Sequence, residues 1–372
     1  MAIKSDQSGN PISFIDLVAQ YKRQKTLIDE RIQKVLEHGQ FILGPEVAEL
    51  EQALIEFTGA QHCVSVASGT DALLLSLMAL GIGSNDEVIT TPFTFVSTVE
   101  VIVRLGAIPV FADVEADTGN IDATAIEALI GPRTRAIMPV SLYGQPSDMD
   151  SINALAEKYA DLPVIEDAAQ SFGALYKNRR SCNLSTIGCT SFFPSKPFGA
   201  FGDGGAIFTN SAVLAQICRE LSVHGQGERF VHKRVGLCSR LDTLQAAILL
   251  AKLHGFDAEI AARREVGRRY DVLLNEAGIQ AVVQRSDRSG VYAQYSVMVD
   301  DRDAVCGRLQ SAGIPFAIYY PRLIYQQPAY QHLQPATDLP VACRMATKVL
   351  SLPMHSGLEH IEQVRVVECL LG

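Results

Sequence analysis

The sequence predicts an α/β protein: a mostly parallel sheet of about seven strands flanked by helices, followed by a smaller C-terminal α/β domain. Two observations support this prediction. Short runs rich in β-branched residues alternate with segments long enough for helices, as in βα units of a parallel sheet. The chain has 372 residues, of which 48% are hydrophobic and 20% charged, and this length exceeds one typical core. We therefore expect two domains, residues 1–255 with an N-terminal arm and residues 256–372.

The predicted strands of the large domain fall into two groups. Two runs, "CTSFFP" (189–194) and "GGAIFTN" (204–210), are separated only by a glycine-rich loop, which is too short for a parallel crossover. We expect these two strands to be antiparallel. The other five, each followed by a segment of helical length, are "HCVSVAS" (62–68), "DEVITTP" (86–92), "IPVFADV" (108–114), "RAIMPVSLY" (135–143) and "LPVIEDAAQ" (162–170).

The second half of the chain begins with a helical pattern. Residues 241–278 predict one long helix, in which apolar spacing at i, i+3 and i+4 gives way to a charged second half that leads into the second domain. Beyond it, the sequence predicts a strand over 290–300 and a helix over 301–312. Prolines punctuate the following segment, 313–330.

Composition narrows the possible partners and compartments. The formal net charge of −9 argues against nucleic acid or an anionic membrane as the main partner, and favours a small molecule. Eight cysteines without a CxxC pair suggest neither a disulfide framework nor a metal site, so we expect reduced, mostly buried thiols. Residues 1–17 lack a basic segment followed by an apolar run, and no apolar stretch reaches about 18 residues. We therefore expect a cytoplasmic protein.

Lys196 is the first candidate for chemistry. A lone lysine near a glycine-rich turn is usually a solvated surface charge. Here aromatic side chains lie on both sides, and they favour partial desolvation, which lowers the pKa of an amine and makes the neutral form available for Schiff-base chemistry. These aromatic neighbours are Phe192, Phe193, Phe198 and Phe201.

Further polar and aromatic residues follow the predicted strands, where ligands of open α/β sheets bind. A helix begins after 62–68, and its free N–H groups suit a phosphate, although a simple N-cap is the commoner reason for such residues. A carboxylate, Asp167, follows the strand "LPVI", where a turn acceptor is the competing interpretation. Together with Lys196 these groups match the needs of pyridoxal phosphate: a lysine, an anion, a phosphate anchor and a flat surface. The remaining members are Gly69, Thr70, Asp71, Phe95, Gln170 and Ser191.

At this point the sequence resembles the DegT/DnrJ/EryC1/StrS family of sugar aminotransferases, which have the aspartate-aminotransferase fold (fold type I of pyridoxal-phosphate enzymes). The resemblance covers almost the whole chain, in the family's order. It is carried by "FIDLVAQY" (14–21), "FILGPEV" (41–47), "VASGTDAL", "TTPFTFVST", "VIEDAAQSFGA", "SFFPSK", "GDGGAIFTN", "RLDTLQAAIL" and "SLPMH" (351–355).

The resemblance implies roles for these residues. Lys196 would form the Schiff base with pyridoxal 5'-phosphate and then move the proton of the substrate, and Asp167 would pair with the pyridine nitrogen. Gln170 would contact the ring hydroxyl and Phe95 would stack on the ring. The phosphate contacts would be Ser191, Gly69, Thr70 and Asp71.

Family members are homodimers, and the resemblance implies that a loop before the long helix enters the partner's active site. In many relatives that loop carries an asparagine two residues before an arginine. This chain has Cys238 at the asparagine position, and a thiol is a poor replacement for an amide donor to the phosphate. Arg240 is present, and its planar fork suits a phosphate or a carboxylate of the substrate.

Within the family the sequence looks closest to the branch that aminates UDP-2-acetamido-2-deoxy-3-oxo-glucuronate for surface polysaccharide such as lipopolysaccharide O-antigen, with glutamate as the expected amino donor. A basic segment near the expected subunit crossing could receive the uronate and the diphosphate, although a solvated basic loop is an equally good interpretation. The candidate substrate contacts are His224, Arg229, His232, Lys233, Arg234, Arg240, Tyr319, Tyr320 and His355.

Four alternatives accompany this interpretation. An aminotransferase could act on a 3-keto or 4-keto deoxyhexose nucleotide instead. Sugar dehydratases of the family replace the lysine with histidine, whereas this chain keeps Lys196. A regulatory or structural homologue would be indicated by loss of Lys196 or Asp167, and both are present. A nicotinamide enzyme is disfavoured because no G-x-G-x-x-G follows the first strand.

Overall fold

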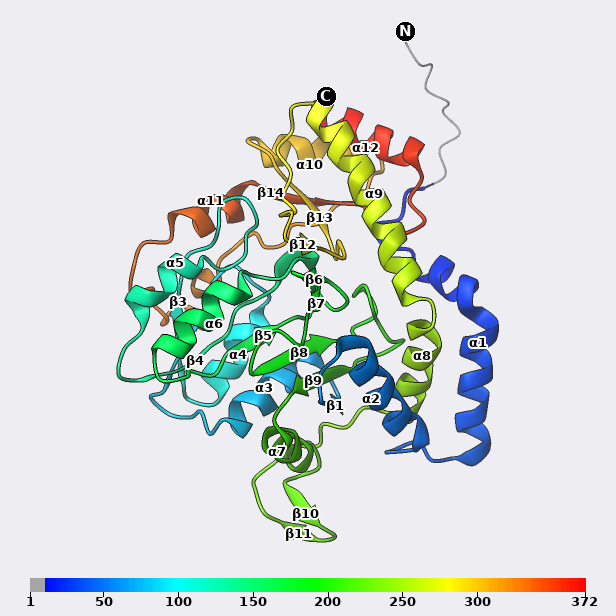
Figure 1. Ribbon diagram of the computed structural model, residues 1–372. Helices are drawn as coiled ribbons and strands as arrows, with labels where there is room; N and C mark the ends of the chain where they lie inside the picture. The colour runs from blue at the N-terminus through cyan, green and yellow to red at the C-terminus, as the bar shows by residue number, and fades with distance from the viewer. Residues whose placement is uncertain (1–10) are drawn as a thin grey trace.

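The computed structural model describes residues 11–372, so ten of the residues behind the N-terminal prediction (1–17) lie outside the described part. A seven-stranded sheet forms the centre of the molecule, in the order β1-β9-β8-β5-β4-β2-β3 (Figure 1). Isolated parallel bridges, Ile137 to Val164 and Val140 to Asp167, join its two halves. The strands are β1 (His62–Val66), β2 (Glu87–Thr90), β3 (Ile108–Phe111), β4 (Thr134–Ile137), β5 (Ile165–Asp167), β8 (Ile187–Ser191) and β9 (Gly205–Thr209).

The direction of the strands follows the sequence prediction. Strand β9 runs antiparallel to both β1 and β8, and the neighbours of β2 and β5 are parallel. The prediction of about seven strands, with an antiparallel pair around the loop that carries Lys196, is therefore confirmed. This loop leaves the end of β8, so the lysine lies at the sheet edge where the parallel strands end.

Helices cover both faces of the sheet, because successive strand residues point to opposite faces. In β9, Phe208 belongs to the core under α2 and α8, whereas Ile207 belongs to the core under α3 and α7. Helix α1 packs along α8 at the edge of the molecule (Figure 1). The helices are α1 (Leu17–His38), α2 (Pro45–Thr58), α3 (Gly69–Ala79), α4 (Val96–Arg104), α5 (Ala123–Ile126), α6 (Met149–Lys158), α7 (Ala212–Ser222) and α8 (Thr243–Leu253).

The predicted single helix over 241–278 is wrong. Helix α8 ends at Leu253 and α9 begins at Phe256, with Gly255 between them at φ −106° and ψ 7°. A Cβ atom at this glycine would lie 2.6 Å from Nε2 of Gln24 on α1, the end of a flexible side chain. Glycine is a poor helix former, and the helix breaks at this residue.

A second core lies in the C-terminal part of the chain. Strands β13 (Tyr295–Met298) and β14 (Val349–Leu352) pair antiparallel, and the predictions of a strand within 290–300 and a helix over 301–312 are confirmed. Strand β14 was not predicted from the sequence. The division of the chain at residue 255 stays a prediction. The helices of this part are α9 (Phe256–Glu276), α10 (Arg302–Ser311), α11 (Pro340–Lys348) and α12 (His360–Leu371).

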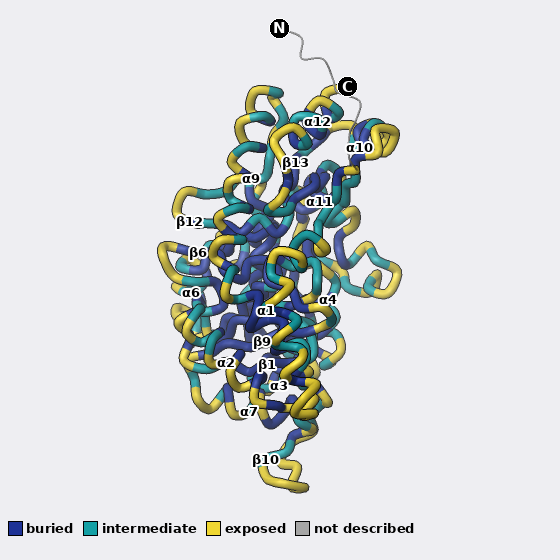
Figure 2. The backbone as a smooth tube through the Cα atoms, turned by 90° about the vertical axis from the view of Figure 1, so that its right-hand side faces the viewer, coloured by how far each residue is buried: buried dark blue, intermediate teal, exposed yellow. Residues whose placement is uncertain are grey.

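Smaller elements complete the fold. Segment 313–330 contains the short 3-10 helices Ile324–Gln326 and Pro328–Tyr330. A minor sheet is formed by β6 (Leu175–Tyr176), β7 (Arg179–Arg180) and β12 (Arg288–Ser289). A hairpin of β10 (Gln226–Glu228) and β11 (Val231–His232) projects from the body, and Figure 2 shows its exposure. Within residues 11–372, no helix has the length and apolar character needed to cross a membrane.

All eight cysteines are free, and half of them are buried. Cys63, Cys182, Cys189 and Cys218 lie in the interior, whereas Cys238 is exposed. The expectation of mostly buried thiols therefore holds for these four buried cysteines and fails for Cys238, Cys306, Cys343 and Cys369.

Candidate active site

A cavity of about 430 Å³ opens at the edge of the sheet where the parallel strands end. Its wall includes most of the residues that sequence analysis singled out: Gly69, Thr70, Phe95, Asp167, Gln170, Ser191, Lys196, Tyr319 and Tyr320. The other predicted residues do not line it in this chain: Asp71, His224, Arg229, His232, Lys233, Arg234, Cys238, Arg240 and His355.

Lys196 lies in the wall of this cavity. Its backbone N–H donates to the carbonyl of Phe193 at 2.9 Å, in a tight turn after β8. Burial lowers the pKa of the amine, and the nearby charge of Asp167 partly opposes that shift. A larger fraction of the amine is therefore neutral at a given pH than for an exposed lysine.

Asp167 is the last residue of β5 and is 5% exposed. Its Oδ2 accepts a hydrogen bond from Oγ1 of Thr98 at 2.8 Å, and its Oδ1 accepts one from the N–H of Ala169 at 3.2 Å. Burial raises the pKa of Asp167, against the effect of these bonds and of the charge of Lys196. Two donors thus fix the carboxylate against the strand end.

Lys196 and Asp167 line the same cavity without forming an ion pair: in the described part of the chain, none within 4.0 Å joins them. The charge of Lys196 lowers the pKa of Asp167, and the charge of Asp167 raises the pKa of Lys196. Both groups line one cavity, so a molecule bound there could interact with both.

Thr98 was not predicted from the sequence. This residue lies in the first turn of α4, and its hydroxyl also meets that of Thr94 at 3.0 Å. The signal was the hydroxyl spacing i, i+4 in "TTPFTFVST", but only the tertiary structure shows that Thr98 faces Asp167.

The start of α3 forms a cradle suited to an anion. Oγ of Ser68 accepts from the N–H of Asp71 at 3.0 Å, which caps the helix. The N–H groups of Gly69 and Thr70 precede the first intrahelical bonds, where the helix dipole favours negative charge. A Cβ atom on Gly69 would lie 2.6 Å from Cβ of Ser191, so only glycine lets the two segments meet. Asp71 contributes to the cap and does not line the cavity.

Gln170 and two aromatic residues form the next part of the wall. Oε1 of Gln170 accepts from the N–H of Tyr143 at 2.9 Å, and its Nε2 donates to the hydroxyl of Tyr320 at 3.3 Å. The Phe95 ring is 52% exposed and lies 6.4 Å from the Tyr320 ring, centroid to centroid. Burial raises the pKa of Tyr320, so its hydroxyl stays protonated and can donate a hydrogen bond.

The cavity has a distinctive charge balance. Among the described residues that line it, Lys196 is the one cation, whereas Asp167 and Asp203 are acidic. The predicted basic contacts lie elsewhere: His224 and Arg229 are exposed on the projecting hairpin, and Nη2 of Arg240 donates to Sγ of Cys238 at 2.9 Å. Within residues 11–372, the buried Nε of Arg240 has no hydrogen-bond partner.

His355 also lies outside the lining of this cavity. It is half-buried, and its surroundings include Asp16 and Arg23 from the N-terminal segment. Burial lowers the pKa of His355, which favours the neutral form of the imidazole.

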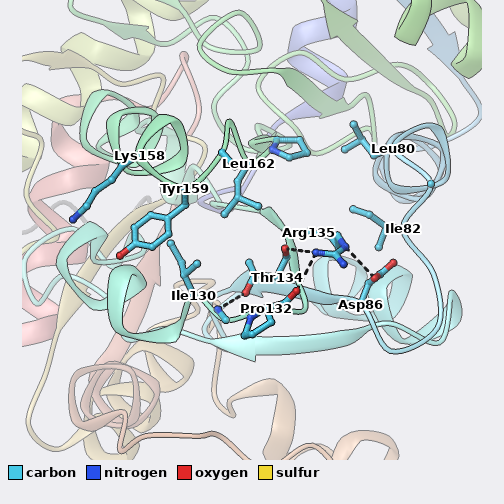
Figure 3. Close-up of a pocket in the computed structure, with 14 residues that line it drawn as sticks. Leu80, Ile82, Asp86, Ile130, Pro132, Thr134, Arg135, Lys158, Tyr159 and Leu162 are labelled. Atoms are coloured by element: carbon cyan, nitrogen blue, oxygen red, sulfur yellow. Dashed lines mark hydrogen bonds and ion pairs between the residues drawn. The ribbon is translucent and has the colours of Figure 1, made fainter.

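A second hollow, of about 800 Å³, lies at the opposite edge of the sheet and is shown in Figure 3. Asp86 and Thr134, at the starts of β2 and β4, are part of its wall, and Asp86 pairs with Arg135 at 3.4 Å. None of the residues assigned to the site by sequence analysis lines this hollow.

The smaller cavity fits pyridoxal 5'-phosphate. The cofactor needs a desolvated lysine, a fixed carboxylate for its ring nitrogen and an anchor for its phosphate. Lys196, Asp167 and the cradle at Gly69, which a Cβ atom would fill, supply these three features around one space. The fold and the site together define a pyridoxal-phosphate-dependent aminotransferase.

The chain belongs to the DegT/DnrJ/EryC1/StrS aminotransferase family, whose model matches residues 22–371. It is 55% identical to the UDP-2-acetamido-2-deoxy-3-oxo-D-glucuronate aminotransferase of Pseudomonas aeruginosa, over 94% of this chain and 96% of the relative. It is 41% identical to the UDP-N-acetyl-3-dehydro-alpha-D-glucosamine 3-aminotransferase of Acidithiobacillus ferrooxidans, over 95% and 96% of the two chains.

A solved structure extends the similarity to three dimensions. The NtdA protein of Bacillus subtilis, described with bound cofactor PMP, matches with a TM-score of 0.89 at 30% identity, over 99% of this chain and 86% of that one. The predictions of fold, family, enzyme class and cofactor are confirmed.

Proposed function

We propose that the chain transfers an amino group from an amino acid, with L-glutamate as the expected donor, to UDP-2-acetamido-2-deoxy-3-oxo-D-glucuronate. The product would serve surface polysaccharide biosynthesis in the cytoplasm, such as the supply of an O-antigen sugar. The observation that carries the transfer chemistry is the cavity shared by Lys196, Asp167 and the cradle at Gly69. The relative that is 55% identical supports the choice of sugar.

Each residue of the cavity has a task in this proposal. Pyridoxal 5'-phosphate, when bound, supplies an electron sink for the carbon that gains or loses the amino group. Asp167 would hold the proton on the pyridine nitrogen, because Thr98 and Ala169 fix its carboxylate. Ser191, Thr70 and the N–H groups that start α3 would hold the phosphate.

Lys196 would have two tasks. Its amine would attach the cofactor, and once released it would take the proton from the amino-bearing carbon of the donor. The lowered pKa of Lys196 suits both tasks, since a neutral amine is the nucleophile and the base. Gln170, held by Tyr143 and Tyr320, would bind the ring hydroxyl.

We further propose a homodimer with shared active sites. The sugar nucleotide carries a carboxylate and a diphosphate, whereas Lys196 is the one cation among the described residues of the cavity wall. His224, Arg229 and Arg240 would supply positive charge to the partner's cavity. Cys238 would contribute no amide donor there, because its side chain is a thiol; its sulfur accepts from Arg240 within its own chain.

The second relative suggests the competing substrate, 3-keto UDP-N-acetylglucosamine, whose sugar ring carries no carboxylate. The two sugars differ in the carboxylate, so their comparison isolates the proposed basic contacts. A charge-assisted hydrogen bond contributes about 1.5–3 kcal/mol, so kcat/KM should favour the uronate by roughly tenfold to a hundredfold.

The preference is measurable in the reverse direction, with each 3-amino UDP sugar and 2-oxoglutarate as substrates. Equal kcat/KM values for the two sugars would contradict the uronate assignment. Turnover of both sugars with 2-oxoglutarate but not with pyruvate would support glutamate as the amino donor.

A further inference from the structure

Lys252 is a buried cation for which the proposed chemistry has no task. It lies on the inner side of α8 and is 5% exposed, next to the buried Ala251. Lysines are rarely buried to this extent unless polar partners compensate the loss of water. The partners of Lys252 therefore indicate what it does.

The ammonium of Lys252 joins two segments that are far apart in the sequence. Its Nζ donates to Oε1 of Gln20 on α1 at 2.8 Å and also to the backbone carbonyl of Gly199. The Phe201 ring lies 5.5 Å from Nζ. Two of these three contacts belong to the loop that carries Lys196.

No carboxylate neutralises this cation within the described residues: no ion pair of Lys252 lies within 4.0 Å. Its charged surroundings are Arg23 on α1 and Glu259 and Arg263 on α9, and Glu259 already pairs with both arginines at 3.3 and 3.2 Å. Burial lowers the pKa of Lys252 to about 8. An apolar residue would fill this place at less cost if packing were the only requirement.

The segment that Lys252 holds is tightly coupled to Lys196. A Cβ atom at Gly199 would lie 2.6 Å from the carbonyl oxygens of Phe193 and Pro194, so the loop folds closely upon itself around Lys196. The N–H of Ala200 donates to the carbonyl of Phe192 at 2.7 Å. A displacement of Gly199 would therefore move the backbone of Lys196.

Helix α8 holds the same loop at a second point. Oε1 of Gln245 accepts from the N–H of Phe201 at 2.9 Å. Gln245 and Lys252 are seven residues apart, which places them two turns apart on one face of the helix. One face of α8 thus binds the loop at Gly199 and at Phe201, and Gln20 of α1 also binds Lys252, the residue that holds Gly199.

We propose that Lys252 is a positioning residue, whose bonds to Gly199 and Gln20 fix the loop that orients Lys196. The inference rests on the proposed role of Lys196. Its own consequences concern the geometry and solvation of the Lys196 loop, which can be measured without cofactor or turnover.

The test replaces Lys252 by methionine, which keeps much of the length and removes the donor. In cofactor-free protein, amide hydrogen exchange of residues 197–204 should speed up by roughly tenfold, whereas exchange in α2 should not change. A looser loop would admit water and so raise the pKa of the Lys196 amine. In pulse acylation followed by peptide mapping, the pH at which half of Lys196 is labelled should therefore be higher than in the wild type.

In the loaded enzyme, Lys252→Met should lower kcat by roughly tenfold and change KM by less than about twofold, since a small misplacement affects the chemical step. Lys22→Met, at an exposed lysine of α1, is the matched control and should leave all four measurements unchanged. Unchanged exchange and labelling in Lys252→Met would overturn the proposal, as would faster exchange throughout the chain.

A second variant covers the case in which Lys252→Met does not fold. Gln20→Leu removes one partner from the partly buried surface of α1 and leaves the bond to Gly199. It should produce the same changes in loop exchange and Lys196 labelling, at smaller size, and wild-type values would contradict the proposal. If another lysine were found to hold the cofactor, the proposed role of Lys196 would be wrong. The exchange and labelling measurements would still show whether Lys252 fixes the loop.

Discussion

The two hollows at opposite edges of the sheet differ in volume and in whether their charged side chains form ion pairs. The larger one, about 800 Å³, has exposed cations that already have partners: Arg135 pairs with Asp86, and Lys158 pairs with Glu127. The smaller one, about 430 Å³, has a lysine without an ion-pair partner in the described chain and a carboxylate that is 5% exposed. Volume therefore does not identify the functional site.

Helix direction explains the contrast. Helix α3 begins at the smaller cavity, where Gly69 and Thr70 present free N–H groups, and its C-cap residue Leu80 lines the larger hollow. Tyr159, the C-cap of α6, lines the larger hollow as well. Helix N-termini attract anions and C-termini repel them, so a phosphorylated cofactor favours the smaller cavity.

Replacing Lys196 should give the largest difference between the two hollows. Lys196→Ala removes the amine that attaches the cofactor and moves the proton, so single-turnover transamination should slow by about a thousandfold or more. Lys158→Ala, in the larger hollow, is the matched control and should keep normal turnover. Substantial turnover by Lys196→Ala would show that another residue performs the chemistry.

Asp167→Asn should have the next largest effect. The amide keeps the shape of the side chain but not the charge, so transamination should slow by roughly a hundredfold or more. Because the charge of Asp167 raises the pKa of Lys196, its removal should lower that pKa further. In cofactor-free protein, acylation of Lys196 should then begin at lower pH. A shift to higher pH, or a near-normal rate, would contradict this role.

Arg240→Ala tests whether the smaller cavity is completed by a partner subunit. Loss of one charge-assisted contact of about 1.5–3 kcal/mol should lower kcat/KM by roughly tenfold to a hundredfold. Arg240→Lys should not restore it if the contact is bidentate.

Mixing Arg240→Ala with Lys196→Ala subunits makes this test decisive. Random pairing would give heterodimers with one intact site, and activity should recover to roughly a quarter of the wild-type value. No recovery, once subunit exchange has been demonstrated, would show that Arg240 serves its own chain.

Arg135→Ala should have the smallest effect. Its pair with Asp86 is solvent-exposed, with 54% of the Arg135 side chain accessible, so the free energy of unfolding should change by less than about 1 kcal/mol. Turnover should stay within about twofold of wild type. A larger loss of turnover would mean that the larger hollow also takes part in function.

Much of this site was predictable from local sequence. Asp167 and Ser191 lie at strand ends, and the aromatic neighbours of Lys196 indicated that its amine is desolvated. Both features depend on residues that are close in sequence. The helix break at Gly255 was missed because the helical pattern continues on both sides of this single glycine. The bonds of Thr98 to Asp167 and of Lys252 to Gly199 were not predictable, since they join distant segments.

Lys196 is proposed to hold the cofactor through a covalent bond. Borohydride reduction of the loaded protein, followed by peptide mapping, would fix the cofactor to the amine that holds it. We predict the pyridoxyl group on Lys196, in the peptide that contains Phe192 to Gly204, and no label on Lys158 or Lys252. A label on any lysine other than Lys196 would contradict the assignment of the active site.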